Sequence, residues 1–282
     1  MAERPARQAP RAQGAQVVRT ERITPHMVRV VLGGEGLAGF TLSGFTDHYI
    51  KLCFAPEGAD YAHPFDMARI REEQPRERWP VTRTYTVRSW DPAARELTVD
   101  FVVHGDKGLA GPWAVRARPG DQVTFLGPGG KYGPKPSADW HLLAGDESAL
   151  PAIAATLEQM PRGATVHAFI EVSDASEEQK IVTPDGVPVT WLHRGDRPVG
   201  EALVAAVREL DFPEGEVQAF VHGEAGCVKE IRRYLRLERR IPREQLSISG
   251  YWRLGHNDEA WRAVKREWNE QVEREQEGTI PR

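Results

Sequence analysis

The stretch Arg83-Thr84-Tyr85-Thr86-Val87-Arg88 places one aromatic ring, two hydroxyl groups and two guanidinium groups within six residues. Its alternation predicts a β-strand, and a strand that only fills a core rarely carries two cations. The mixture suits a strand lying along a flat, anionic ligand such as a flavin nucleotide. Tyr85 can stack on a ring, Thr86 can donate to a ring nitrogen, and either arginine can pair with a phosphate. A plain barrel strand with alternating exposure is the alternative.

This stretch lies among other strand-like segments in the first half of the chain. Each is rich in β-branched residues, and Gly, Pro and Asp separate them. The predicted strands are 16–23, 26–32, 48–54, 81–90, 96–104 and 121–126. Six strands with little helix between them predict a small closed antiparallel barrel. The insert at 55–80 is rich in Pro and charge, and we expect it on the surface.

Two glycine-rich segments follow the strand that carries the arginines. The first, His104-Gly105-Asp106-Lys107-Gly108-Leu109-Ala110, opens a short apolar helix, and free N–H groups at a helix start form a phosphate site. An ordinary strand-to-helix connection is the alternative. The second, residues 127–133, holds four glycines, which favour either close approach to a ligand or a hinge between domains.

The second half of the chain alternates strands with helices. The predicted strands are 140–144, 165–172, 187–192, 217–222 and 245–249, and the helices are 150–160, 199–210 and 225–239. This pattern predicts a parallel sheet with helices on both faces, which binds ligands at the carboxyl ends of its strands. The fold class is therefore α+β in two domains: an N-terminal six-stranded antiparallel barrel and a C-terminal α/β nucleotide-binding domain with a helical tail.

Two strand tips of the second half are candidate nucleotide sites, although the chain has no GxGxxG motif. The first strand ends in Gly145-Asp146-Glu147-Ser148-Ala149-Leu150, whose two acids make a poor pyrophosphate cradle. A nicotinamide nucleotide would have to lie across it through other contacts. A similar tip follows at 222–226, so that two tips face one crevice. Structural turns are the alternative reading of both.

The tail after Gly250-Tyr251-Trp252-Arg253 predicts a helix over 257–276. Trp261, Val264, Trp268 and Val272 recur at helical spacing, which predicts that this stripe docks the helix on the body.

Composition excludes several classes of function. A formal charge of -4 argues against a general nucleic-acid binder, so an anionic ligand must be met by local basic clusters. Two cysteines, far apart and without a CxxC pair, argue against a zinc or iron–sulfur site and fit a reducing compartment. Residues 1–14 are expected to form a disordered lead-in, not a signal peptide, and no apolar run is long enough for membrane insertion.

Taken together, these motifs resemble the ferredoxin–NADP reductase superfamily and, more narrowly, the siderophore-interacting proteins, which are FAD-containing ferric-siderophore reductases. The resemblance runs from about Val17 to Trp268. It rests on the stretch 83–88, on His104-Gly105-Asp106, on residues 145–152 and on Gly250-Tyr251-Trp252-Arg253. It implies a FAD-binding barrel at 15–134, a domain for NADH or NADPH at 135–250, and a C-terminal segment at 251–282.

The resemblance also implies site residues. Thr86 would lie near the reactive flavin nitrogen. Non-covalent FAD and the nicotinamide nucleotide would be bound by Arg83, Thr84, Tyr85, Thr86, Val87, Arg88, His104, Gly105, Asp106, Gly108, Leu109, Ala110, Gly145, Asp146, Glu147, Ser148, Ala149, Leu150 and Trp252. Lys51 matches a basic position that docks the iron chelate, and Lys131, Arg253 and Lys265 are further candidates.

The expected activity is electron transfer from NAD(P)H through FAD to Fe(III) held by a siderophore in the cytoplasm. A ferredoxin as partner, or siderophore binding without turnover, are the alternatives. The choice of nucleotide stays open: Glu171 and Asp174 suit a free ribose hydroxyl, whereas Arg194, Lys229 and Arg232 suit a 2′-phosphate.

Overall fold

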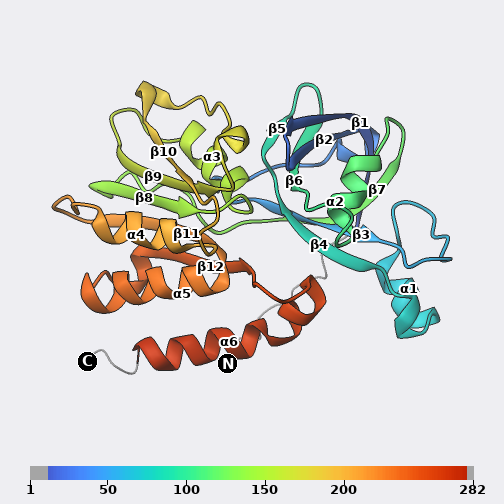
Figure 1. Ribbon diagram of the computed structural model, residues 1–282. Coiled ribbons are helices and arrows are strands. Elements are labelled where there is room, and N and C mark those ends of the chain that lie inside the picture. Colours follow the sequence, from blue (N-terminus) through green and yellow to red (C-terminus); the bar gives the residue numbers. More distant parts are fainter. Residues whose placement is uncertain (1–11, 278–282) are drawn as a thin grey trace, which may run out of the picture.

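The computed structural model describes residues 12–277, which form two domains that lie side by side (Figure 1). The N-terminal domain is an antiparallel sheet in the order β4-β3-β7-β1-β2-β6-β5. Its strands are β1 (Gln13–Thr24), β2 (Met27–Gly33), β3 (Tyr49–Phe54), β4 (Val81–Thr86), β5 (Ser89–Asp91), β6 (Glu96–Val102) and β7 (Gln122–Gly129).

The predicted strand 81–90 is broken into β4 and β5, and this break closes the barrel. The two pieces are the opposite edges of the sheet. Between them, the Val87 amide donates to the His48 carbonyl oxygen at 2.7 Å, next to β3, and the Arg88 amide donates to the Thr98 carbonyl oxygen of β6 at 2.9 Å. At Val87 and Arg88 the chain changes its partner from β3 to β6. The single predicted strand 81–90 therefore supplies both edge strands of the sheet, β4 and β5. The predicted six-stranded barrel is confirmed, with this one strand divided in two.

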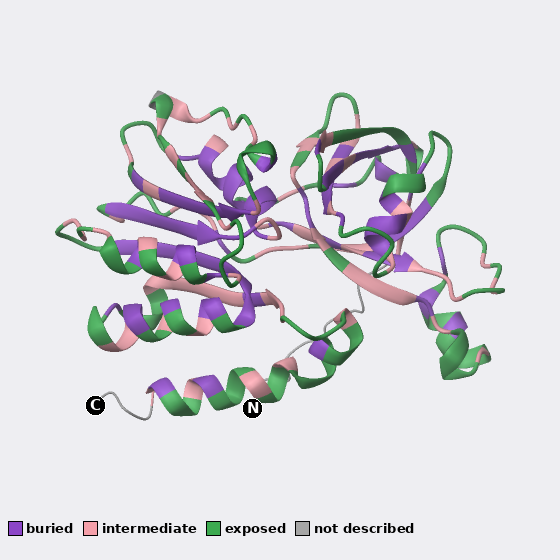
Figure 2. Cartoon of the chain, in the orientation of Figure 1, coloured by how far each residue is buried: buried purple, intermediate pink, exposed green. Residues whose placement is uncertain are grey.

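The barrel interior is apolar, as the alternation predicts. The apolar strand residues that form this core are buried, and Figure 2 shows them as purple stretches of the strands. Helix α2 (Ala110–Arg116) adds Ala110 and Ala114 to this core. The insert at 55–80 is more than a surface loop, since it contains helix α1 (Met67–Glu73), whose Met67 and Ile70 pack with Phe65 in a small core of their own.

The C-terminal domain is a parallel sheet in the order β10-β9-β8-β11-β12. Its strands are β8 (Trp140–Gly145), β9 (Thr165–Val172), β10 (Val189–His193), β11 (Val217–Glu224) and β12 (Leu246–Trp252), and its helices are α3 (Leu150–Glu158), α4 (Glu201–Glu209) and α5 (Ala225–Arg233). Helix α3 packs in one core, and α4 and α5 pack in the core on the other face. The strand order reverses between β8 and β11, and such a switch point is where open α/β sheets bind ligands.

Helix α6 (Asp258–Glu277) lies beneath both domains and is tied to each of them (Figure 1). At its start, Arg262 donates to the Thr82 carbonyl oxygen at 2.6 Å. At its end, Glu277 pairs with Arg232 at 2.6 Å. The predicted docking stripe is partly wrong: Trp261 and Val272 are buried, but Val264 is an exposed position, because ion pairs rather than a continuous apolar face hold the helix.

Two of the predicted domain boundaries differ from the structure. Gln13 and Gly14, expected in a disordered lead-in, belong to β1, because they pair with Phe125 and Thr124 of β7. The rest of the predicted lead-in, residues 1–11, lies outside the described residues. The predicted division after residue 250 falls inside β12, where the strand continues to Trp252. Among residues 12–277, no helix has the length and apolar character needed to span a bilayer.

Candidate cofactor and substrate site

The outer face of β3 and β4 meets the strand tips of the C-terminal domain. Directly paired residues of antiparallel strands share a face, so Thr86 lies beside Tyr49, and Thr84 lies beside Lys51. Burial raises the pKa of Tyr251 in β12, and the nearby charge of Asp47, two residues before β3, adds to this rise. The outer face of β3 and β4 therefore lies next to β12 of the C-terminal domain.

Thr86 is the residue of this face that the resemblance places near the reactive flavin nitrogen. It is 9% exposed. Its hydroxyl bonds to no group within residues 12–277, so it is available to a ligand. Val87, by contrast, is in the barrel core and offers a ligand its backbone alone, and Thr84 is exposed.

Tyr85 and Arg83 lie on the other face of β4. The Tyr85 ring packs on Phe101 with centroids 4.3 Å apart and planes inclined by 38°. The Arg83 guanidinium pairs with Asp258 at 3.2 Å and also with Glu259, both at the start of α6. A phosphate that binds Arg83 must therefore displace or share these two carboxylates.

Arg88 is directed away from β4 toward the other domain. Both of its Nη atoms donate to Glu158 in the last turn of α3, at 2.7 and 2.5 Å. The Arg88 Nε atom is buried and forms no hydrogen bond among the described residues. This placement gives the guanidinium a protein carboxylate as its main partner.

The glycine turn before α2 fits a pyrophosphate. Gly105 and Gly108 have φ of 60° and 82°, which glycine adopts without strain, and open space lies where a Cβ would point. No side chain caps α2, and the amides of Gly108 and Leu109 donate to no atom of the described chain. Asp106 is exposed on the same turn. The residues present therefore fit FAD, with the turn and the start of α2 toward its pyrophosphate.

His104, at the start of this turn, lies near the loop at 145–150 of the C-terminal domain. Burial lowers the pKa of His104, and the nearby charges of Glu147 and Arg194 act on it in opposite directions. The barrel turn that begins at His104 and the strand tip at 145–150 of the C-terminal domain, both candidate sites from the sequence, are therefore close to each other.

The loop at 145–150 is held by its own side chains. Asp146 accepts hydrogen bonds from the Ser148 amide and hydroxyl, from the Glu224 amide, and from the Trp252 indole at 2.8 Å. Burial raises the pKa of Asp146 to about 6. Asp146 thus joins the tips of β8, β11 and β12.

The remaining residues of this loop offer little charge to a ligand. Glu147 pairs with Arg194 at 2.9 Å. Ala149 and Leu150 are fully buried. A Cβ on Gly145 would lie 2.6 Å from the His222 carbonyl oxygen, so close packing requires glycine there. The loop therefore presents backbone and small side chains to a nucleotide.

The structure contradicts the expectation that Glu171 binds a ribose hydroxyl of the nucleotide. Glu171 is fully buried and accepts from the Gly200 and Leu203 amides at 2.8 and 3.1 Å, so it cannot reach a ribose hydroxyl. Asp174 is exposed and accepts from the Ser176 amide and hydroxyl. The candidates for a 2′-phosphate are engaged as well: Arg194 pairs with Glu147 and Glu171, Lys229 with Glu275, and Arg232 with Glu277.

The four candidates for docking the chelate differ from these paired arginines. Lys51, Lys131, Arg253 and Lys265 pair with no carboxylate of the described chain. Arg253 and Lys265 each lie 5.9 Å from the centre of the Trp261 ring. Burial lowers the pKa of Lys265. In a chain of net charge -4, cations without carboxylate partners are the ones available to an anionic ligand.

Sequence reasoning missed the acids that bind the site arginines: Glu158, Asp258 and Glu259. The acidic pair Asp258 and Glu259 could have been noticed in the sequence, because acidic residues at the start of a helix are favoured by the helix dipole. Tyr49 was also missed, although its pairing with Thr86 follows once β3 and β4 are placed in register.

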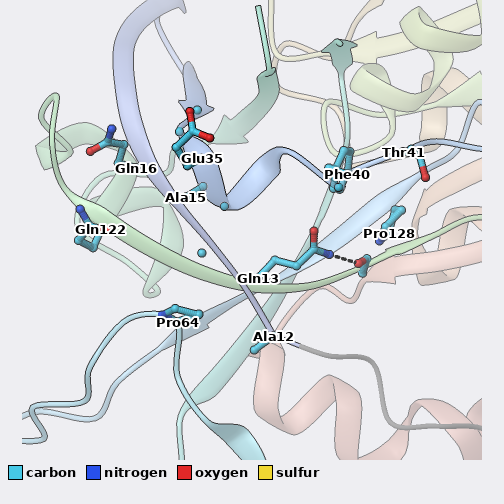
Figure 3. A pocket seen from close by; sticks show the side chains of 16 residues that line it. Ala12, Gln13, Ala15, Gln16, Glu35, Phe40, Thr41, Pro64, Gln122 and Pro128 are labelled. Atoms are coloured by element: carbon cyan, nitrogen blue, oxygen red, sulfur yellow. Dashed lines mark hydrogen bonds between the residues drawn. The ribbon is translucent and has the colours of Figure 1, made fainter.

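A cavity of about 1010 Å³ lies elsewhere on the barrel, between β1, β7 and the segment 33–41 (Figure 3). Its lining includes one charged residue, Glu35, which pairs with Arg95 at 3.0 Å. This cavity has no cation for an anionic ligand. Within residues 12–277 there is also no cluster of His, Cys, Asp and Glu suited to a metal ion.

Comparison with known proteins identifies both halves of the chain. Residues 16–132 match the siderophore-interacting FAD-binding domain, and residues 138–255 match the siderophore-interacting protein family. Ferric vibriobactin reductase ViuB of Vibrio cholerae is 38% identical over 249 residues, which are 86% of this chain and 90% of that protein. NADPH-dependent ferric-chelate reductase of Escherichia coli is 33% identical over 241 residues, covering 84% of this chain and 91% of its own.

Solved structures agree with these relatives. A siderophore utilization protein from T. fusca is 40% identical, with a TM-score of 0.75 over 88% of this chain and 95% of that one. The ferredoxin reductase in carbazole 1,9a-dioxygenase, 16% identical with a TM-score of 0.61, shares the fold. The matches in both domains and the full-length relatives show that the chain belongs to the siderophore-interacting protein family.

Proposed function

We propose that this protein is an FAD-dependent reductase of ferric siderophores that draws electrons from NAD(P)H. One observation carries the proposal: the face of β3 and β4 that carries Thr86 in the FAD-binding domain lies next to β12 of the C-terminal domain. The names of the Vibrio cholerae and Escherichia coli relatives, both ferric reductases, support the same activity.

The residues of the chain bind and orient, and none of them needs to act as an acid or base. FAD, when bound, supplies the chemistry: it takes two electrons as hydride and gives them singly to Fe(III). The Gly105–Leu109 turn and the start of α2 bind the pyrophosphate, Thr86 donates toward the flavin edge, and the loop at 145–150 receives the nicotinamide nucleotide.

Release of iron follows from ligand preference. The oxygen ligands of catecholate and hydroxamate siderophores are hard and favour Fe(III), so reduction to Fe(II) weakens their hold. Lys51, Lys131, Arg253 and Lys265 attract the anionic chelate, because they are free of carboxylate partners within the described chain. We assign the reaction to the cytoplasm, where NAD(P)H is present, and NADPH is the donor named for the Escherichia coli relative.

The proposal is tested with the purified protein. It should be yellow, bind FAD non-covalently, and oxidise NADPH or NADH faster when a ferric siderophore is added. Arg83→Ala should lower FAD occupancy while the far-UV circular dichroism stays that of the wild type, since it removes a phosphate partner. A colourless protein that takes up no added FAD contradicts the proposal. Turnover that requires a ferredoxin, with no response to NAD(P)H, assigns the protein to a different electron donor.

A further inference from the structure

A cluster of charged groups ties the barrel to the last turn of α3. Arg88 donates to both carboxylate oxygens of Glu158, and the side chains are 10% and 31% exposed. Beside them, Arg29 pairs with Asp100 at 2.7 and 2.8 Å, and a carboxylate oxygen of Asp100 lies 3.9 Å from the Arg88 Nε atom. Because Arg88 is mostly removed from water and pairs with two atoms, its geometry is more restricted than that of a surface ion pair.

A second contact holds the same end of the helix. The hydroxyl groups of Thr46, before β3, and Thr156, in α3, are buried and lie 2.8 Å apart. Thr156 is two residues before Glu158. The barrel therefore holds the end of α3 through one ion pair and one hydrogen bond.

Helix α3 transmits this anchoring to the nucleotide site. It is buried from Leu150 to Leu157, which leaves it little freedom to bend or slide. It begins directly after the loop at 145–149 and ends at Glu158, a length of about 12 Å at 1.5 Å per residue. On the barrel side, Arg88 follows Thr86 by two residues. The same short segment of barrel thus carries both the flavin-facing hydroxyl and the anchor of the helix that presents the nucleotide loop.

We propose that Arg88 is a positioning residue: through Glu158 it fixes α3, and with it the loop at 145–149, opposite Thr86, and so sets the geometry of electron transfer from the nicotinamide nucleotide. This rests on the proposed function and deepens it. It gives Arg88 a role between the domains in place of the cofactor contact that the family resemblance implies.

The test compares Arg88→Met, Glu158→Gln and the double variant with Arg19→Met as control. Arg19 lines a cavity together with Arg88 and Glu158, but it forms an exposed pair with Glu96 within the barrel. Four quantities are measured: FAD affinity by flavin fluorescence, the rate of anaerobic flavin bleaching at saturating NADPH, the re-oxidation of dithionite-reduced protein by a ferric siderophore, and hydrogen exchange of the 145–149 amides without FAD.

Glu158→Gln and Arg88→Met should each slow bleaching at saturating NADPH by about ten-fold or more, since small displacements of reacting groups have effects of this size. The double variant should be no slower than either single variant, because both remove one contact. FAD affinity and re-oxidation by the chelate should stay at the wild-type level, and exchange of the loop amides should rise. Arg19→Met should match the wild type throughout.

Two results overturn the proposal. If Arg88→Met weakens FAD binding while Glu158→Gln bleaches at the wild-type rate, Arg88 is a flavin ligand. If both variants bleach at the wild-type rate, the contact has no positioning role. Should Arg88→Met fail to fold, Glu158→Gln decides alone, since Glu158 is partly exposed. Failure of the proposed function is distinct, because the wild type itself would then not be bleached by NADPH.

Discussion

Lys51→Ala should weaken the productive encounter with an anionic ferric siderophore without changing FAD content. Lys51 lies on the outer face of β3 opposite Thr84, partly exposed, and pairs with no carboxylate of the described chain. Its ammonium is therefore available to attract a trianionic chelate. The substitution removes one positive charge and leaves the β3–β4 ladder intact, because that ladder is made of backbone hydrogen bonds.

Coulomb's law gives the expected size of the effect. A unit charge about 6 Å from a trianion in water contributes about 2 kcal/mol before screening. With Debye lengths of about 30, 8 and 3 Å at about 0.01, 0.15 and 1 M salt, about 1.7, 1.0 and 0.3 kcal/mol remain. The predicted rise in KM is therefore about 18-fold at the lowest salt, about 5-fold at intermediate salt and less than about 2-fold at the highest.

The assay is steady-state oxidation of NADPH with a ferric triscatecholate as acceptor across these salt concentrations. A rise in KM with kcat kept marks a binding role, whereas a fall in kcat points to the geometry of electron transfer. Lys180→Ala, an exposed lysine of the C-terminal domain, is the control and should match the wild type. A KM for Lys51→Ala that equals the wild-type value at low salt refutes the reasoning and moves the docking site toward Lys131 and Arg253.

Three further predictions follow from the contacts. The double variant Asp258→Asn, Glu259→Gln should bind FAD more tightly, because these two carboxylates compete with a phosphate for Arg83. Fluorescence titration measures the affinity. Weaker binding by the double variant, or equally tight binding by the control Glu267→Gln, contradicts this prediction. Asp146, with a pKa raised by burial from 3.8 to about 6, stabilises the fold when protonated, and this contribution is lost as the pH rises through 6. From pH 7 to pH 5 the free energy of unfolding in urea should therefore rise by about 1.3 kcal/mol more for the wild type than for Asp146→Asn. The same dependence of the free energy of unfolding on pH in both proteins would disprove this prediction. Glu177→Ala should lower the free energy of unfolding by about 1–3 kcal/mol, because the buried carboxylate accepts from the Thr24 hydroxyl and the His26 amide of the other domain. Glu178→Ala, which loses an exposed contact with His193, should have little effect. Equal losses for the two variants would exclude the interdomain explanation.

Local sequence signals predicted most of the fold. The segment 165–172 is β9 as predicted, because its apolar run and flanking breakers are local features. The break between β4 and β5 was not predictable in this way, since it depends on the hydrogen bonds of Val87 and Arg88 to His48 and Thr98 in other strands.

The site was predicted less completely for the same reason. The residue types that can bind a flavin phosphate are visible in the sequence, but the partners they have in the fold are not. Arg83 meets a glutamate 176 residues away, and Arg88 meets one 70 residues away. Pairs so distant in the sequence leave no periodic or local signal. The packing around the four glycines at 127–133 is also invisible in the sequence, which is why these glycines were open to two interpretations. The structure shows that Gly133 permits close packing, because a Cβ there would lie 2.7 Å from the Gly44 carbonyl oxygen.

The most direct test of the account is a two-step anaerobic experiment on the FAD-loaded protein. NADPH or NADH is added until the yellow flavin absorbance is bleached, and the protein is then mixed with a ferric siderophore or with the same siderophore carrying redox-inert Ga(III). We expect that the absorbance returns with the ferric form, that Fe(II) appears in a trapping assay, and that Ga(III) has no effect. Bleached flavin that stays bleached in the presence of the ferric siderophore would contradict the assignment of this protein as a ferric-siderophore reductase.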